Sequence, residues 1–196
     1  MRTLLTTALV VAGSISVASA APDDKAKAPA PAKDAKAAAP APAPPPPELK
    51  KTVDAFVGNW TIDGTATMPG GAAPMKLKET VVCTKAVAGR VASCTGRANI
   101  PGMGKVEDLM VVTYDAEAKK VRVMGISSMG DVHDHVCTWK DDKTLACDPL
   151  QVTAMGSPAT VTFEMTWTDA KTATMNETVT MKDGSKMTME GVGKKR

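Results

Sequence analysis

Apolar and polar residues alternate along most of the chain after residue 57, as in strands that turn one face to a core and the other to water. The clearest run is residues 161–167, where Val, Phe, Met and Trp share one face. Turn-forming residues interrupt the alternation about every ten residues. Strands are therefore expected at residues 60–68, 75–85, 91–100, 106–114, 120–127, 131–140, 161–167, 172–181 and 186–190.

This pattern predicts an all-β fold, an antiparallel up-and-down barrel of about nine to ten strands. Signals such as Asp183-Gly184 indicate tight hairpins between neighbouring strands. A closed barrel is favoured over a sandwich because an open meander would leave unpaired edge strands. Only residues 48–56 have a helical pattern, and they predict a short N-terminal helix before the first strand.

The beginning of the chain has a different composition and is expected to lie outside the barrel. Residues 1–20 have the basic start, apolar stretch and Ala18-Ser19-Ala20 ending of a signal peptide, with cleavage before Ala21. Residues 21–47 consist almost entirely of Ala, Pro, Lys and Asp, and predict a disordered, extended linker. The barrel domain is then expected at residues 48–196. The linker is either a solvated tail or a spacer that holds the domain off an envelope surface.

These features predict an exported protein, periplasmic or extracellular, with no stable membrane span, because no apolar run reaches the length that a span needs. The net charge of only +3 does not indicate a nucleic-acid partner. The sequence has no G-x-S-x-G, H-E-x-x-H, P-loop or Rossmann pattern, so we lean against an enzyme, name no catalytic residue and expect no cofactor.

Four cysteines in an exported chain favour disulfides over metal or redox chemistry. Cys83 and Cys94 flank one expected hairpin, and Cys137 and Cys147 flank another. A four-residue loop at residues 87–90 would place the first two directly opposite one another, close enough to bridge. We therefore predict the pairs Cys83–Cys94 and Cys137–Cys147, each contributing about 2–3 kcal/mol to stability.

Both histidines of the chain lie on one expected strand, in the sequence GDVHDHVC. On a strand, His133 and His135 share a face, and this spacing occurs in metal sites. Glu177, in an otherwise apolar row, is the candidate third ligand for zinc or ferrous iron. The alternative is a wet strand end with the neighbouring valines in the core, and histidines that are solvated or hydrogen-bonded without a metal are the favoured interpretation.

Methionine is abundant in the expected strands, while phenylalanine and tyrosine are scarce. Flexible Met side chains fill an irregular core, line an adaptable apolar pocket, or bind cuprous copper, and the core interpretation is favoured. Copper sites often pair Met with His, and Met129 is the one methionine that lies close to His133 in the sequence. If the barrel holds a small apolar ligand, the candidate binding residues are Trp60, Met165, Met175 and Glu177.

The run Phe56-Val57-Gly58-Asn59-Trp60 after a short helix resembles the start of a lipocalin or calycin barrel. That resemblance implies that Trp60 plugs the barrel floor. The middle of the chain is similar to an uncharacterised family of bacterial lipocalin-like domains, through short motifs that include ETVV at residues 79–82, AGR at 88–90, PGM at 101–103, VTYDA at 112–116 and SSMGD at 127–131. The family implies the fold and brings no activity with it.

Three hypotheses follow for function. The first is an exported module that binds a small apolar or amphipathic ligand inside a lipocalin-like barrel and is not an enzyme. The second is a metal-binding protein or metal-dependent enzyme that uses His133, His135 and Glu177. The third is a structural or interaction protein whose barrel is packed solid.

Overall fold

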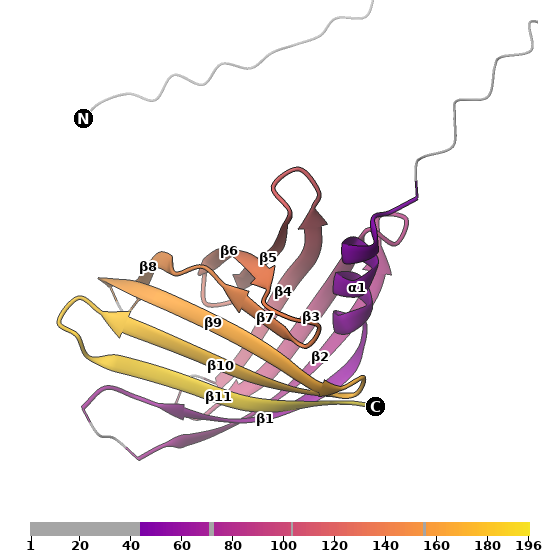
Figure 1. Ribbon diagram of the computed structural model, residues 1–196. Coiled ribbons are helices and arrows are strands. Elements are labelled where there is room, and N and C mark those ends of the chain that lie inside the picture. Colours follow the sequence, from indigo (N-terminus) through magenta and orange to yellow (C-terminus); the bar gives the residue numbers. More distant parts are fainter. Residues whose placement is uncertain (1–43, 71–72, 103, 155) are drawn as a thin grey trace, which may run out of the picture. The chain divides into compact units, whose positions relative to one another are not determined.

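The structure is a computed structural model that describes residues 44–70, 73–102, 104–154 and 156–196 (Figure 1). The predicted signal peptide at residues 1–20 and the predicted linker up to residue 43 lie outside the described residues. Among the residues described, no helix is both long enough and apolar enough to cross a membrane.

The elements follow the alternation closely. In chain order they are α1 (Pro47–Phe56), β1 (Gly58–Thr67), β2 (Met75–Ala86), β3 (Val91–Ile100), β4 (Gly104–Asp115), β5 (Lys120–Ser127), β6 (Val132–Trp139), β7 (Thr144–Cys147), β8 (Leu150–Ala154), β9 (Ser157–Asp169), β10 (Thr172–Met181) and β11 (Lys186–Lys195). The helix begins one residue before its predicted start. The strands β7 and β8 were not among the expected ranges, because each is too short to display a period of two.

All strands except β8 form one closed antiparallel ring, which confirms the predicted barrel (Figure 1). Neighbours along the chain pair from β1 to β7, and β11 returns to pair with β1. The ring passes from β7 directly to β9, and β9 pairs in turn with β10. The extra strand, β8, pairs with the first half of β9. Closure places alternate residues of every strand inside the barrel.

One end of the barrel is filled by the main hydrophobic core. The helix α1 buries Leu49, Val53 and Phe56 in that core. The indole N–H of Trp60 donates to the carbonyl oxygen of Phe56 at 2.7 Å, and that of Trp139 donates to the buried Thr52 hydroxyl at 3.0 Å. These bonds satisfy polar atoms that burial would otherwise leave without water. The helix and its tryptophan partners therefore close this end of the barrel.

Two disulfides join the predicted cysteine pairs. Cys83 lies opposite Cys94 across β2 and β3, with their Cα atoms 3.9 Å apart. Cys137 lies opposite Cys147 across β6 and β7, with their Cα atoms 3.8 Å apart. The second bridge fastens the shortest strand of the ring, which pairs with β6 at three positions and with β9 at three.

The ring is least complete along the first half of β6. That strand meets β7 only from Cys137 to Trp139. In the part of the chain that the structure describes, residues 132–135 pair with β5 alone. Both histidines thus lie on a segment that is free of strand pairing along one edge.

We expect the second disulfide to hold this part of the ring together. The double variant Cys137→Ala/Cys147→Ala should lose about 2–3 kcal/mol of unfolding free energy in urea titrations. The amides of β7 should also lose their protection from hydrogen exchange, because few hydrogen bonds remain to hold that strand.

The matched control is Cys83→Ala/Cys94→Ala, which opens a loop of similar length between two long strands paired at eight positions. It should lower stability comparably and leave β7 protected. Full protection of β7 in the Cys137→Ala/Cys147→Ala variant would show that the disulfide does not hold this strand in the ring.

Candidate functional site

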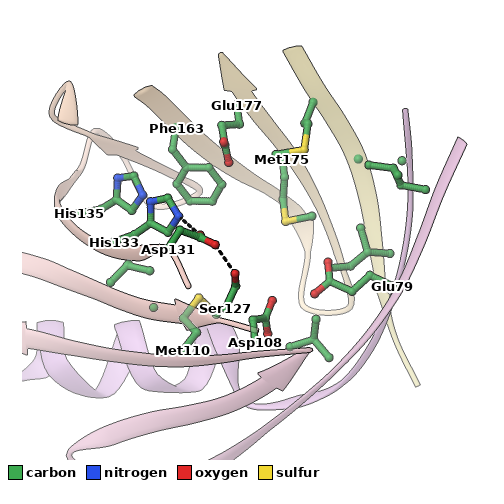
Figure 2. Close-up of a pocket in the computed structure, with 18 of the residues that line it drawn as sticks. Glu79, Asp108, Met110, Ser127, Asp131, His133, His135, Phe163, Met175 and Glu177 are labelled. Carbon is green, nitrogen blue, oxygen red and sulfur yellow. Dashed lines mark hydrogen bonds and ion pairs between the residues drawn. The ribbon is translucent and has the colours of Figure 1, made fainter. Parts of the chain in front are cut away.

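A cavity of about 350 Å³ lies inside the barrel, at the low end of the volumes typical of small-molecule sites (Figure 2). Most of its wall is apolar. The apolar side chains that line it include Ile62, Leu77, Val81, Met110, Val123, Phe163, Met175 and Met189. A smaller set of polar residues also lines it, namely Glu79, Asp108, Ser127, Asp131, His133, His135, Glu177 and Glu190.

Strand alternation explains why carboxyl groups lie among these apolar residues. Glu79 follows the same face of β2 as Leu77 and the buried Val81. Glu177 occupies the same face of β10 as Met175 and the buried Val179. Since successive side chains of a strand point to opposite faces, closing the ring turns these acids inward.

Glu79 and Asp108 meet across Gly96, which stands on the strand between them. The register pairs Gly96 with Val81 of β2 on one side and with Asp108 of β4 on the other. A Cβ atom at position 96 would lie 2.1 Å from Oδ1 of Asp108 and 2.4 Å from Oε1 of Glu79. The missing side chain of Gly96 therefore makes the space in which the two carboxyl groups converge.

This convergence changes the acidity of Glu79. Burial, the charge of Asp108 and a hydrogen bond with Asp108 together raise the pKa of Glu79 to about 7. Glu79 thus keeps its proton up to near-neutral pH and donates it to the Asp108 carboxylate. A protonated Glu79 can donate a hydrogen bond as well as accept one, on one face of the cavity.

Besides the Glu79–Asp108 pair, a second cluster of polar side chains in the cavity is centred on Asp131. The hydroxyl of Ser127 and the Nε2 of His133 both bond to the Asp131 carboxylate, shown as dashed lines in Figure 2. Burial alone would raise the pKa of Asp131, but these two hydrogen bonds hold it below its ordinary value. Asp131 is therefore an ionised carboxylate on the cavity wall.

His135 and Glu177 are less well satisfied. The His135 side chain is 9% exposed, stacks on His133 with ring centroids 5.7 Å apart, and lies 5.9 Å from the ring of Phe163. Burial lowers the pKa of His135, the charge of His133 lowers it further, and Asp134 opposes both, so the ring is neutral. Burial raises the pKa of Glu177. The charge of Asp131 raises it further, and the charge of His133 lowers it.

The structure divides the candidate ligand-binding residues into two groups. Met175 and Glu177 line the cavity, as Figure 2 shows. Trp60 and Met165 are buried, 8% and 9% exposed, in the core near the closed end. The candidate binding set thus contributes two residues to the cavity wall and two to the packing beside it.

The favoured interpretation was of solvated or hydrogen-bonded histidines, and His133 is indeed hydrogen-bonded to Asp131, but the two rings do not face open water. His133 and His135 face the cavity, while Val132 is 68% exposed on the outer face. The reason lies further along β6, where Cys137 is fully buried and disulfide-bonded and so fixes the inner face of the strand. Residues 133 and 135 lie an even number of positions from Cys137, so their side chains point to the same face.

The three candidate metal ligands, His133, His135 and Glu177, come to one cavity. Within the described residues, however, no three His, Cys, Asp or Glu side chains are arranged to hold a metal ion. Met129, the candidate copper partner of His133, is 60% exposed. The metal hypothesis stays a prediction without a coordination geometry behind it.

Glu79 and Asp108 were missed in the sequence, although the signal that identified Glu177 also applies to them. Each is an acid in a row that is otherwise apolar, with Leu77 and Val81 beside Glu79, and Met110 beside Asp108. Their meeting across Gly96 needs the register of three strands, which one sequence does not determine.

Comparison with known proteins identifies a family and a fold. The family model "Protein of unknown function (DUF1579)" matches residues 46–195. No curated protein matches the sequence. Among solved structures, an S-type phycobiliprotein lyase, CPES from Guillardia theta, has a TM-score of 0.55 at 9% identity, over 78% of this chain and 98% of that one. At that identity the likeness shows the fold alone.

Two further structures match more loosely. A redesigned β-barrel has a TM-score of 0.37 at 12% identity, over 74% of this chain and 95% of that one. EF1p2_mFAP2b bound to DFHBI has a TM-score of 0.40 at 11% identity, over 76% of this chain and 99% of that one.

The acid pair should make stability depend on pH. Because folding raises the pKa of Glu79 from 4.5 to about 7, the folded state loses stability relative to the unfolded state as pH rises through that window. Glu79→Gln removes this loss. The unfolding free energy of the variant should therefore rise relative to that of the wild type by about 1–2 kcal/mol between these pH values, allowing for solvent screening. Urea unfolding across the pH range measures the difference.

Glu107→Gln is the control, since Glu107 neighbours Asp108 on β4 but lies on the outer face in an exposed pair with Arg97. Its stability relative to the wild type should not change with pH in this window. A Glu79→Gln variant that follows the wild type at every pH would refute the raised pKa of Glu79.

Proposed function

The chain belongs to DUF1579, a family of proteins of unknown function, and from its cavity we propose that it is an exported small-ligand-binding module. The ligand is apolar or amphipathic and is held inside the barrel without chemical change. The observation that carries this proposal is the cavity of about 350 Å³ with a mainly apolar wall and two polar groups. The fold shared with the phycobiliprotein lyase supports the barrel, and the function rests on the cavity.

The driving force for binding is burial of apolar ligand surface. The thioethers of Met110, Met175 and Met189 reach the cavity wall, and their flexible side chains adapt to ligands of irregular shape. Burial stabilises a ligand by roughly 25 cal/mol for each Å² of apolar surface removed from water. These three methionines thus supply adaptable contact area, while Met165 fills the core as the sequence favoured.

The polar groups orient the ligand. Glu79 and Asp108 lie on one side of the cavity, and Asp131, His133 and Glu177 on another (Figure 2). A few convergent polar groups in an apolar cavity fix which end of a ligand lies where. An amphipathic molecule would place its polar head among them and its apolar body against the methionines.

The cavity also separates this proposal from a barrel packed solid. A solid interior would leave no space inside the ring, whereas this one leaves about 350 Å³. Export is supported by the two disulfides, which persist in oxidising compartments. The linker, predicted from the sequence, would then place the binding module at a distance from an envelope surface.

Gly125 offers a direct test of the cavity. It lies on the inner face of β5, and the atom nearest to a Cβ placed there is the carbonyl oxygen of Leu109 at 3.8 Å. Gly125→Leu would therefore fill the cavity without displacing backbone. Binding of the apolar fluorophore N-phenyl-1-naphthylamine should weaken by about tenfold or more, while the melting temperature holds or rises, because glycine is a poor strand residue.

Met124→Phe is the matched control. Met124 is the preceding residue of the same strand, points outward and is 38% exposed, so the added bulk lies outside the barrel. This variant should bind the fluorophore like the wild type. Equal binding by Gly125→Leu, or no binding by the wild type, would sink the proposal.

A further inference from the structure

The cavity collects acids without basic side chains to match them. Five acidic residues line it, namely Glu79, Asp108, Asp131, Glu177 and Glu190. No Lys or Arg is present among the described residues that line it. Two histidines are the basic groups of the wall, and one of them, His135, is neutral because burial lowers its pKa. The interior of the barrel is therefore biased toward negative charge.

Several acids elsewhere in the protein have cationic partners. Asp54 pairs with Lys85 at 2.7 Å, and Asp134 pairs with Arg122 on the outer face of β6. Glu177 differs, since no hydrogen bond or ion pair joins it to any other residue within the described ranges. The Glu177 carboxyl group is half-buried on the cavity wall and burial raises its pKa, so a cation beside it would favour its charged form.

His135 provides a second and independent sign of a missing partner. Its side chain is 91% buried, since 9% is exposed, and its Nδ1 has no hydrogen-bond partner in the described structure. His135 belongs to the wall of the same cavity, beside His133 (Figure 2), and its ring centroid lies 5.9 Å from that of Phe163. An unmatched polar atom of this kind costs about 1–3 kcal/mol, and it marks this part of the cavity wall as incompletely satisfied.

We propose that the cavity selects amphipathic ligands that carry a primary ammonium group, with the cationic head between the acids and the apolar body against the methionines. The inference rests on the proposed function and names the ligand class for the same site. An ammonium group brings a positive charge for the Glu177 and Asp131 carboxylates and three N–H donors for their oxygens.

The negative charge of the cavity also disfavours anionic ligands whose apolar chain is as long as that of the ammonium ligand. A carboxylate head would enter a cavity that already holds the ionised Asp131 and the charge of the Glu79–Asp108 pair, with no Lys or Arg among the described lining residues to receive it. Like charges at close range in a cavity poor in water repel strongly. A neutral alcohol of the same chain length gains only the apolar contacts and a single hydrogen bond.

Three probes of one chain length separate these cases. Octylammonium, 1-octanol and octanoate would each be titrated against bound N-phenyl-1-naphthylamine at a pH of about 8, above the pKa of about 7 for Glu79. Octylammonium should have a Kd about tenfold below that of 1-octanol, and octanoate should bind more weakly than 1-octanol. The preference should shrink as salt is raised, to the extent that the site is open to solvent.

Glu177→Gln and Asp108→Asn should reduce the preference for octylammonium over 1-octanol to about threefold or less, with little change in the Kd of 1-octanol. That unchanged Kd shows that the cavity of each variant is intact. The control is Glu107→Gln, which removes one negative charge from the outer face beside Asp108 and should leave the preference in place.

The possible results separate the two proposals. Equal Kd values for the three probes in the wild type would overturn the cationic selectivity and leave small-ligand binding standing. A preference that survives both Glu177→Gln and Asp108→Asn would also overturn it. If the wild type binds neither the fluorophore nor any of the three probes, the proposed function itself is wrong.

Discussion

Closure of the ring through β9 is the constraint on which the rest of the structure depends. This strand pairs with the short β7 on one side and with β10 on the other, so the meander has no free edge at this point. Closure commits alternate residues of every strand to the interior, whether they are apolar or not. The helix α1 and the tryptophans occupy one end of that interior. The remaining space becomes the cavity, and its chemistry is whatever the inner rows of the strands carry.

The inner rows carry acids, and the barrel accommodates each of them differently. Glu79 and Asp108 are hydrogen-bonded in the space that Gly96 leaves open, and this contact raises the pKa of Glu79. Asp131 stays ionised because Ser127 and His133 bond to it. Glu177 has burial as the main influence on its pKa and has no partner among the described residues. Buried polar groups are normally fully satisfied, and incomplete satisfaction at one place in a fold indicates where function is located.

Much of the fold could be predicted because its signals are local. The disulfides follow from cysteines that flank hairpins, and the inward carboxyl of Glu177 follows from its apolar neighbours on one strand. The histidines could not be placed, because Val132 and Val136 alternate with them and offer an equally plausible core face. Their orientation is decided by Cys137 and its bridge. The meeting of Glu79 and Asp108 is a long-range consequence of register across Gly96, and no local pattern contains it.

The central claim is that the interior of this barrel is a ligand site, and the methionine methyl groups report on it most directly. Met110, Met175 and Met189 line the cavity, whereas Met124 and Met129 are exposed. With ¹³C-labelled methionine methyls, titration with N-phenyl-1-naphthylamine followed by NMR should shift the first three signals together and saturably, and leave the last two in place. Shifts confined to Met124 and Met129, or no shifts at all, would contradict the account.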